Sequence, residues 1–361
     1  MGKYKVCVYA ICKNEEKFAK KWYKSMSEAD YVCVLDTGSE DNTVEVLRNL
    51  GARVESKVIS PWRFDVARNL SMELIPEDTD ICVCTDLDEV FNEGWRELLE
   101  EKWESNACRV LYNYNWSLDE DDKPIINFYL NNIHKRGDYV WKHPVHEVLT
   151  YTGEDESILV VPEICLNHYP DGNKSRGSYL PLLEMSVEED PLDDRNMHYL
   201  GREYMYYGKW NDAIDVLIRH LGLESAKWKD ERCASMRFIG RCYWALLRYD
   251  EARLWYERAI VEAPYLRDGY IEYGIFEYEM GNYETAIGLF MRGLFRNREH
   301  KSYINEAFCR DSVICDYISM CLWYLGDYVD AVYFVDRALM DCPDDERLLG
   351  NRAVFSNMMG V

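Results

Sequence analysis

The chain has 361 residues, of which 48% are hydrophobic and 14% aromatic, so it has enough apolar material for sizeable cores and is not a disordered protein. Its 65 acidic and 42 basic side chains give a net charge of -23, which disfavours binding to nucleic acid and to anionic membranes. A phosphate ligand would therefore need a metal ion or a few local basic side chains.

Short apolar runs alternate with helical stretches over the first hundred residues. Helices are expected directly after Asn14 and at 43–50, 64–75 and 94–103, between strands at 5–12, 31–35, 52–59, 81–85 and 107–114. Asn14 is predicted to cap the first helix and Gly51 to end the second. Strands that are apolar throughout and separated by helices indicate an α/β domain with a Rossmann-like, mostly parallel sheet covered on both faces.

Ligands bind such sheets beyond the carboxyl ends of the strands, where Asp36 and Asp86 fall. Residues 106–192 are rich in Tyr, Trp, His and Asn and predict twisted strands with long loops. We assign them to the acceptor side of the first domain, since polar and aromatic loops commonly contact substrates. The first domain is therefore predicted to span 1–192.

From about Asp193 the pattern changes to amphipathic helices with an internal repeat. Four segments share a small or apolar residue, an aromatic residue two positions later and an alanine three after that: GKWNDA at 208, LRYDEA at 247, GNYETA at 281 and GDYVDA at 326. Ala252 and Ala286 are 34 residues apart, the tetratricopeptide period, whereas the other spacings are 39 and 45. Residues 193–361 are therefore predicted to form about four irregular tetratricopeptide-like repeats, with an ordinary helical bundle as the alternative.

Targeting signals and cysteine usage favour a cytoplasmic protein. No apolar run is long enough to span a bilayer, and no cleavage site follows the apolar start, so we expect neither a transmembrane segment nor a signal peptide. The thirteen cysteines are scattered and form no Cys-x-x-Cys pair, which favours reduced, buried thiols over disulfides or a cysteine-based zinc site.

Three acidic side chains, Asp86, Asp88 and Glu89, follow the predicted strand at 81–85. Carboxylates this close repel one another unless a cation or hydrogen-bond donors share them. Mn²⁺ and Mg²⁺ prefer carboxylate and phosphate oxygens, so the cluster suits a nucleotide-sugar diphosphate bound through a divalent ion. An Asp-x-Asp pair is a weak signal by itself, and capping of the next helix by Asp88 or Glu89 is the alternative.

Four segments in order, ICKNEE, VLDTGSEDNT, FDVARN and TDLDEVF, resemble the inverting family-two glycosyltransferases of the GT-A fold, over roughly residues 3–170. The helical repeats resemble the branch of that family with tetratricopeptide tails, which includes the sublancin-type S-glycosyltransferases. This resemblance implies a metal-dependent inverting hexosyltransferase. Its expected donor is a UDP-sugar, and its expected acceptor is a peptide or protein side chain.

The resemblance also implies roles for individual residues. Contacts to the nucleotide-sugar are assigned to Ile11, Asn14, Asp36, Arg68, Asp86, Glu89, Lys174 and Arg176, the last two on a lid loop. The metal, Mn²⁺ or Mg²⁺, is assigned to Asp88 and His168, and acceptor contacts to Trp141 and His143. Glu147 is the expected base that deprotonates the acceptor, with His146 as the alternative. Asp65 either orients Arg68 or lies inert on a helix surface.

Other functions remain open at this point. The chain could instead modify a cell-surface glycan or act as a catalytically weak nucleotide-sugar-binding scaffold. A nucleotidyltransferase or pyrophosphorylase usually carries a Gly-rich basic signature near the first strand, which YAICKNEE lacks, and no GxGxxG supports a dehydrogenase. The repeats are expected to bind a polypeptide acceptor or to form a homodimer contact.

Overall fold

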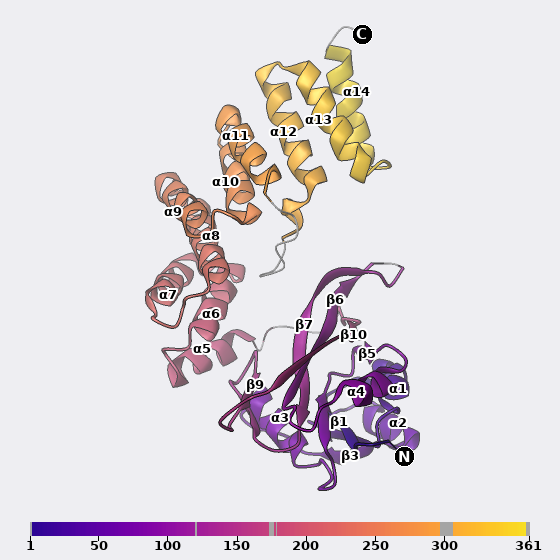
Figure 1. Cartoon of the computed structure of the whole chain (residues 1–361). Coiled ribbons are helices and arrows are strands. Elements are labelled where there is room, and N and C mark those ends of the chain that lie inside the picture. The colour runs from indigo at the N-terminus through magenta and orange to yellow at the C-terminus, as the bar shows by residue number, and fades with distance from the viewer. Residues whose placement is uncertain (1, 120, 173–176, 178, 297–305, 359–361) are drawn as a thin grey trace. The chain divides into compact units, whose positions relative to one another are not determined.

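The chain folds into two units, the first from Met1 to Ser186 and the second from Val187 to Val361. The computed structural model describes residues 2–119, 121–172, 177, 179–296 and 306–358 (Figure 1). The predicted domain boundary, between residues 192 and 193, lies six residues after the one observed.

An eight-stranded mixed sheet in the order β3-β2-β1-β4-β7-β6-β10-β5 forms the centre of the first unit (Figure 1). Its strands are β1 (Val6–Cys12), β2 (Tyr31–Asp36), β3 (Arg53–Ser56), β4 (Ile81–Cys84), β5 (Glu89–Phe91), β6 (Arg109–Leu118), β7 (Pro124–Lys135) and β10 (Ile158–His168). The first four strands of the chain are parallel to one another, as predicted. β7 runs antiparallel to both β4 and β6, so the sheet is mixed.

The remaining elements of this unit cover the two faces of the sheet. They are the helices α1 (Glu16–Met26), α2 (Thr43–Leu50), α3 (Phe64–Met72) and α4 (Trp95–Lys102), and the hairpin of β8 (Tyr139–Lys142) with β9 (Val148–Tyr151). On one face, Val8 belongs to a core with Trp22 of α1 and Trp95 of α4. On the other, Tyr9 belongs to a core with Ala67 of α3 and Trp141 of β8. Alternate β1 residues thus serve opposite cores, as expected for a doubly covered sheet.

The predicted helix cap at Asn14 is wrong. The residue in the capping position before α1 is Glu15, and its side chain makes no capping hydrogen bond. Asn14 instead adopts a left-handed backbone with φ of 56°, and its Oδ1 accepts a 2.7 Å hydrogen bond from the Glu40 amide. Asparagine tolerates this conformation, so its side chain ties together the loops that follow β1 and β2.

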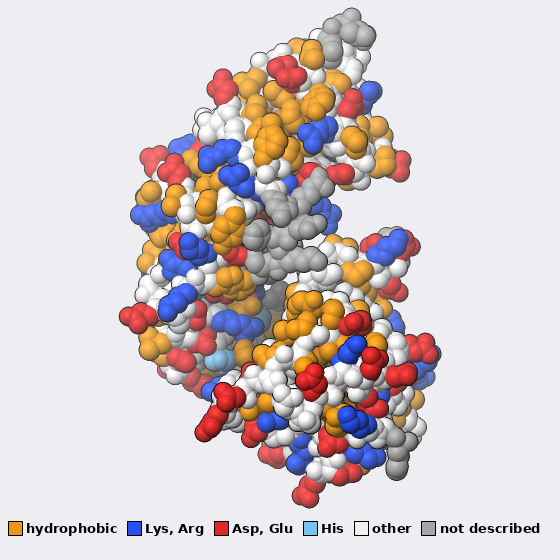
Figure 2. Space-filling model, in the orientation of Figure 1, with side chains coloured by type: hydrophobic (Ala, Val, Ile, Leu, Met, Phe, Trp, Pro, Cys, Tyr) orange, Lys and Arg blue, Asp and Glu red, His pale blue; other side chains and the backbone are white. Residues whose placement is uncertain are grey.

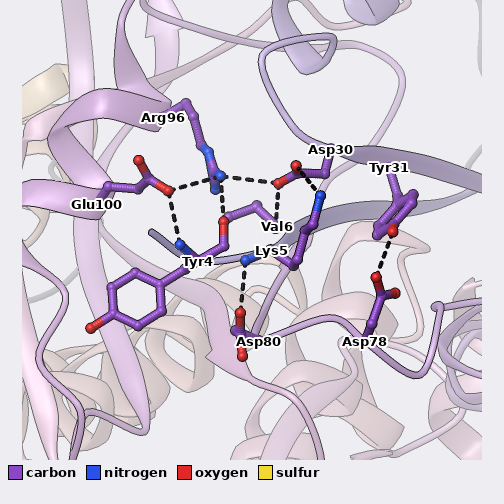
Figure 3. A network of polar contacts seen from close by, with 9 residues as sticks. All are labelled: Tyr4, Lys5, Val6, Asp30, Tyr31, Asp78, Asp80, Arg96 and Glu100. Atoms are coloured by element: carbon purple, nitrogen blue, oxygen red, sulfur yellow. Dashed lines mark hydrogen bonds and ion pairs between the residues drawn. The ribbon is translucent and has the colours of Figure 1, made fainter. Parts of the chain in front are cut away.

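A polar network holds the amino end of β1, at the edge of the sheet opposite the carboxyl ends of the parallel strands (Figure 3). Asp30 Oδ1 accepts a 3.0 Å bond from the Lys5 ammonium, and Asp30 Oδ2 accepts 3.0 Å bonds from the Val6 amide and from Arg96 Nη2. The Lys5 amide donates to Asp80 over 2.7 Å. Burial alone would raise the pKa of Asp30, but the Val6 amide, Lys5 and Arg96 lower it below its ordinary value.

Asp30→Asn is expected to destabilise the first unit by about 1–3 kcal/mol at pH 7, because it removes the charge that Lys5 and Arg96 share. A carboxylate with a lowered pKa stabilises the fold above its unfolded-state pKa, and this contribution disappears as the pH falls through the folded-state value. Urea unfolding should therefore separate wild type from variant at pH 7 and much less at pH 3. Asp78→Asn, which changes the carboxylate that accepts a bond from the Tyr31 hydroxyl, is the control. An equal difference in the free energy of unfolding between wild type and variant at both pH values would contradict the prediction.

The second unit consists of helices that pack in consecutive antiparallel pairs (Figure 1). The pairs are α6 (Asp194–Tyr206) with α7 (Trp210–Gly222), α8 (Lys229–Ala245) with α9 (Tyr249–Glu262), α10 (Arg267–Glu279) with α11 (Tyr283–Leu294) and α12 (Asp311–Leu325) with α13 (Tyr328–Asp341). α5 (Tyr179–Glu189) precedes them, a short 3-10 turn at Ala307–Cys309 precedes α12, and α14 (Glu346–Met358) follows. This is the tetratricopeptide-like architecture that the repeat predicted.

The small residues of the repeat lie where paired helices touch. The four alanines, Ala213, Ala252, Ala286 and Ala331, are fully buried. A methyl group at Gly240 would lie 2.9 Å from the Tyr256 ring, and one at Gly274 2.6 Å from Phe290. The larger partner side chain occupies the space that the glycine leaves. In the first three repeats a glycine stands twelve residues before the alanine of the motif, whereas Ser319 takes that place before Ala331.

The turn between paired helices uses a left-handed residue in every repeat. Gly208, Gly281 and Gly326 have φ of 70°, 77° and 82°, and Leu247 takes the same place with φ of 61°. Each turn closes with the bonds of a Schellman motif, such as Leu247 N–H to the Trp244 carbonyl. Leu247 is therefore strained, because a Cβ is unfavourable in this conformation.

Leu247→Gly is expected to stabilise the second unit by about 0.5–1 kcal/mol, since relief of strain outweighs the added freedom of the unfolded chain. The side chain is 71% exposed, so little packing is lost. Calorimetry should show a rise in Tm of about 1–4 °C. Leu247→Ala keeps the Cβ and should show no such gain. A glycine variant that melts no higher than the alanine variant would refute the account.

None of the helices in the described ranges combines the length and the apolar character needed to cross a bilayer. All thirteen cysteines are free thiols, and ten of them are buried. Burial raises the pKa of most of these thiols, including Cys82 and Cys84 to about 12, which keeps them protonated and unreactive.

Candidate active site

Most of the residues singled out in the sequence lie at the carboxyl ends of the central strands. Asp36 ends β2 opposite Cys12 of β1, and Asp86 follows β4, which also pairs with β1. Ile11, near the end of β1, is buried with 8% exposure. The parallel pairing predicted from the sequence therefore does bring these segments to one edge of the sheet.

Asp36 is buried and held by its own loop. Its carboxylate accepts bonds from the amides of Gly38 (3.3 Å) and Ser39 (3.0 Å). Ser39 Oγ in turn accepts from the Asn14 amide over 2.9 Å. Each carboxylate oxygen has a second lone pair, so the group keeps the capacity to accept from a ligand N–H.

Arg68 of α3 joins two carboxylates that are far apart in the sequence. Its Nη2 donates to Asp86 Oδ1 over 2.7 Å, and its Nε donates to Glu147 Oε1 over 3.0 Å. Nη1 lies 3.4 Å from Cys84 Sγ, and Arg68 is only 7% exposed. Burial alone would lower the Arg68 pKa, but the charges of Asp86 and Glu147 hold it above its ordinary value. Arg68 is therefore permanently charged and fixes the position of both carboxylates.

Two neighbours of Arg68 differ from their expected places. Asp65 is buried and pairs with Arg63 (2.8 Å), so it neither orients Arg68 nor lies on a helix surface. Trp141 is 4% exposed, donates from its indole nitrogen to the Tyr9 hydroxyl over 3.1 Å, and lies beneath the Arg68 guanidinium. Because its ring lies in the core, we withdraw the acceptor contact expected for Trp141 and assign it to supporting Arg68.

Asp88 and His168 face each other at the end of β10. His168 Nε2 lies 3.8 Å from Asp88 Oδ2, and its Nδ1 bonds to the Trp116 carbonyl over 3.0 Å. A carbonyl only accepts, so Nδ1 carries a proton and Nε2 is the atom turned toward the carboxylate. Burial alone would lower the His168 pKa, whereas Asp88 and the Trp116 carbonyl raise it. This donor set fits a divalent cation, since a metal-binding histidine commonly donates its other ring N–H to a carbonyl.

Glu89 opens β5 and completes the acidic cluster. It pairs with His168 across the β5–β10 ladder, and its Oε2 accepts from the Asp86 amide over 2.8 Å. Burial, followed by the charge of Asp86, raises the Glu89 pKa to about 8, although hydrogen bonds from the Asp86 amide and Tyr114 act in the opposite direction. The carboxylates at this strand end thus oppose one another electrostatically, which a bound cation would relieve.

The loop between β8 and β9 carries the remaining predicted residues. His143 and His146 have left-handed backbones, with φ of 79° and 51°, and the His146 ring lies 5.7 Å from that of Tyr179. The side chain of Glu147 is 12% exposed. Lys174 and Arg176, predicted to form a lid, lie outside the described residues.

Two aromatic side chains of β6 belong to the site but were not predicted. Trp116 stacks on His168 with ring centroids 4.7 Å apart, and Tyr114 hydrogen-bonds Glu89. The signal was present in the stretch YNYNW, in which Tyr112, Tyr114 and Trp116 alternate and therefore share one face of a strand. The partner of Trp116, His168, follows more than 50 residues later, and the partner of Tyr114, Glu89, lies more than 20 residues earlier. No local sequence pattern therefore indicates either contact.

Comparisons with known proteins found similarity to parts of the chain. Among solved structures, the MamA protein has 19% identity and a TM-score of 0.37 over 45% of this chain and 81% of its own. Part of a TPR repeat-containing protein from Cytophaga hutchinsonii has 14% identity and a TM-score of 0.42 over 51% and 66%. A thermophilic TPR protein from Thermus thermophilus has 16% identity and a TM-score of 0.36 over 50% and 89%. No curated protein matches the chain significantly.

Residues 7–151 match the sequence model of the family described as glycosyl transferase family 2. The matched range begins in β1 and ends at the last residue of β9, so it contains Asp36, Arg68, the acidic cluster and Glu147. Residues 7–151 therefore resemble a family 2 glycosyltransferase domain, and tetratricopeptide-like helical repeats follow them in the sequence.

Proposed function

We propose that the first unit transfers a sugar from a UDP-sugar to a side chain of a peptide or protein, with inversion at the anomeric carbon and with Mn²⁺ or Mg²⁺ bound. The observation that carries this proposal is the buried Arg68, which hydrogen-bonds Asp86 on one side and Glu147 on the other. Arg68 thus holds Asp86, the carboxylate assigned to the sugar donor, and Glu147, the candidate base, at fixed positions. A single displacement needs donor and base to be positioned relative to each other.

Asp36 and Asp86 supply the nucleotide contacts in this proposal. Asp36 is aimed by the amides of Gly38 and Ser39 and accepts the imide N–H of uracil. Asp86, whose side chain is 48% exposed, uses its second oxygen for a ribose hydroxyl while Arg68 holds the first. Arg68 itself is too enclosed for a phosphate ligand, so we assign it to positioning and not to nucleotide contact.

Asp88 and His168 would hold the divalent ion, which supplies positive charge to a diphosphate in a protein of net charge -23. Trp116 keeps the His168 ring in place by stacking and through its carbonyl. Glu89 stays behind these groups, fixed by the Asp86 amide, and supports the turn that carries Asp88.

Glu147 acts as the general base. A carboxylate can accept a proton from the attacking hydroxyl or thiol, and Arg68 Nε, 3.0 Å from Glu147 Oε1, holds the group in position. The acceptor atom then bonds to the anomeric carbon as the bond from that carbon to the phosphate oxygen breaks, and UDP leaves. His146 has a left-handed backbone and a ring near Tyr179, and it is the alternative base.

Exposed apolar side chains support a polypeptide acceptor. Hydrophobic side chains gather over the β6–β7 region (Figure 2). Trp116, Ile125, Phe128 and Tyr129 are all more than 40% exposed there. Aromatic side chains of this kind commonly anchor peptides. The helical repeats would add a second docking surface or form a homodimer contact. Light scattering of the full chain would distinguish these roles, since a dimer mass favours the homodimer contact and a monomer mass favours the docking surface.

A donor panel tests the proposal. The purified chain is incubated with UDP- and GDP-sugars and Mn²⁺, and free nucleotide is measured with and without a mixture of Ser-, Thr- and Cys-containing peptides. Release of UDP that rises with peptide, together with a peptide mass increased by one sugar, is the expected result. Release stimulated only by oligosaccharides would favour a glycan acceptor. Binding of UDP without release under any condition would favour a scaffold.

A further inference from the structure

Three side chains with metal-binding atoms meet within the second unit, outside the family 2 domain. Asp194 begins α6, His220 lies in the last turn of α7 and Glu231 lies in the first turn of α8. One ligand atom from each lies within 4.8 Å of the others. The three helices come from the first two repeats, so the group joins one repeat to the next.

One of these atoms is a buried nitrogen without a hydrogen bond. His220 is fully buried, and its Nε2 makes no hydrogen bond. Glu231 Oε1 lies 3.3 Å from this nitrogen, and Glu231 is itself 7% exposed. A buried polar atom left without a hydrogen bond costs about 1–3 kcal/mol. A ligand bound to His220 Nε2 would remove this cost.

The other nitrogen of the ring is held in place. His220 Nδ1 bonds to Ser235 Oγ over 3.0 Å, and Ser235 Oγ also bonds to His198 Nδ1 over 2.7 Å. A hydroxyl has one proton, so it donates to at most one of the two rings. When His220 donates from Nδ1 to Ser235, its Nε2 keeps a lone pair beside the Glu231 carboxylate. An oriented imidazole of this kind is typical of a metal ligand.

The spacing also fits a particular ion. A tetrahedral zinc ion with bonds of about 2.0–2.1 Å separates neighbouring ligand atoms by about 3.3–3.4 Å, which matches the observed His220–Glu231 distance. Asp194 is only partly buried, so its carboxylate can turn toward the same centre. Imidazole with carboxylates favours zinc over Mg²⁺, which prefers oxygen alone.

We propose that Asp194, His220 and Glu231 form a zinc site, with water in the fourth position, that fastens α6, α7 and α8 together. The alternative is an ion-free arrangement, in which Asp194 and Glu231 stabilise the positive ends of their helices and Glu231 pairs with a protonated His220. The zinc site predicts that zinc binds and stabilises the protein, and the ion-free arrangement predicts that it does neither.

The test uses the full chain in an Asp88→Asn background, which removes a carboxylate from the candidate catalytic metal site. Metal-free protein is titrated with Zn²⁺ against a chromophoric chelator, and Tm is measured by calorimetry. We expect one zinc per chain and a rise in the Tm of the second unit of roughly 5–10 °C when free zinc exceeds its Kd about hundredfold. Adding His220→Gln or Glu231→Gln should abolish both. Asp215→Asn, an exposed carboxylate on the same helix, should change neither.

The proposal fails if zinc leaves Tm unchanged, or if His220→Gln binds zinc as tightly as its parent. Should the His220 variant not fold, Asp194→Asn replaces it, because that side chain is partly exposed and its loss is less disruptive. Co²⁺ then provides a direct reading. Strong visible absorption in the parent that weakens in Asp194→Asn supports tetrahedral coordination, and a spectrum that is equal in both overturns it.

Discussion

Asp88→Asn should lower the rate of sugar transfer by about a hundredfold or more while leaving the fold intact. Asparagine has nearly the same shape but lacks the negative charge that would share a divalent ion with His168, 3.8 Å away. The loss should appear mainly as a weaker dependence on Mn²⁺, so higher Mn²⁺ should restore part of the rate. The measurement is UDP release and peptide glycosylation across a Mn²⁺ titration, with circular dichroism to check folding.

Asp121→Asn is the matched control for this substitution. Asp121 lies in the turn between β6 and β7, its side chain is 75% exposed, and its ion pair is with the equally exposed Lys123. Its replacement should leave transfer and Mn²⁺ dependence unchanged. If Asp88→Asn keeps near-normal turnover at low Mn²⁺, or if wild type works fully in EDTA, the metal assignment is wrong.

Glu147→Gln should lower kcat by about 10²–10⁴-fold, since glutamine cannot accept the acceptor's proton. Donor binding should change little, because the amide oxygen of glutamine can still accept from Arg68 Nε where Glu147 Oε1 now does, over 3.0 Å. Asp86 would keep its own 2.7 Å bond to the same guanidinium. Single-turnover transfer and UDP affinity, measured separately, test the two halves of this prediction.

Two comparisons make the Glu147 result interpretable. Glu163→Gln changes an exposed carboxylate on β10 and should have no effect. His146→Asn removes the alternative base while keeping a residue type that tolerates a φ of 51°. A kcat loss in His146→Asn alone would move the base to His146. A collapse of UDP affinity in Glu147→Gln would instead mean that Glu147 serves only to hold Arg68.

The local elements follow from the sequence because their signals are local. The helix at 43–50 was predicted with the bounds that α2 has, since Gly51 ends it with φ of 111°. The four repeat motifs each begin a second helix, because the aromatic and the alanine lie within one turn of each other. β1, β2 and β4 were visible as buried runs between helices. The edge that carries Asp36 and Asp86 then followed from parallel pairing alone.

Only the tertiary structure decided which distant groups meet. Arg68 and Glu147 are 79 residues apart and His168 and Asp88 are 80 apart, and no periodicity connects them. The placement of β7 between β4 and β6, and of β5 beside β10, likewise depends on pairings that compete across the whole sheet. Asn14 and Asp65 differed from expectation because neighbouring loops and Arg63 offered better hydrogen bonds than the local helix did.

The sequence by itself thus determined the elements, the repeat and the edge where ligands bind, because those depend on neighbours along the chain. The ion pairs, the partner of each histidine and the Asp194–His220–Glu231 group depend on neighbours in space, so only the folded chain could reveal them.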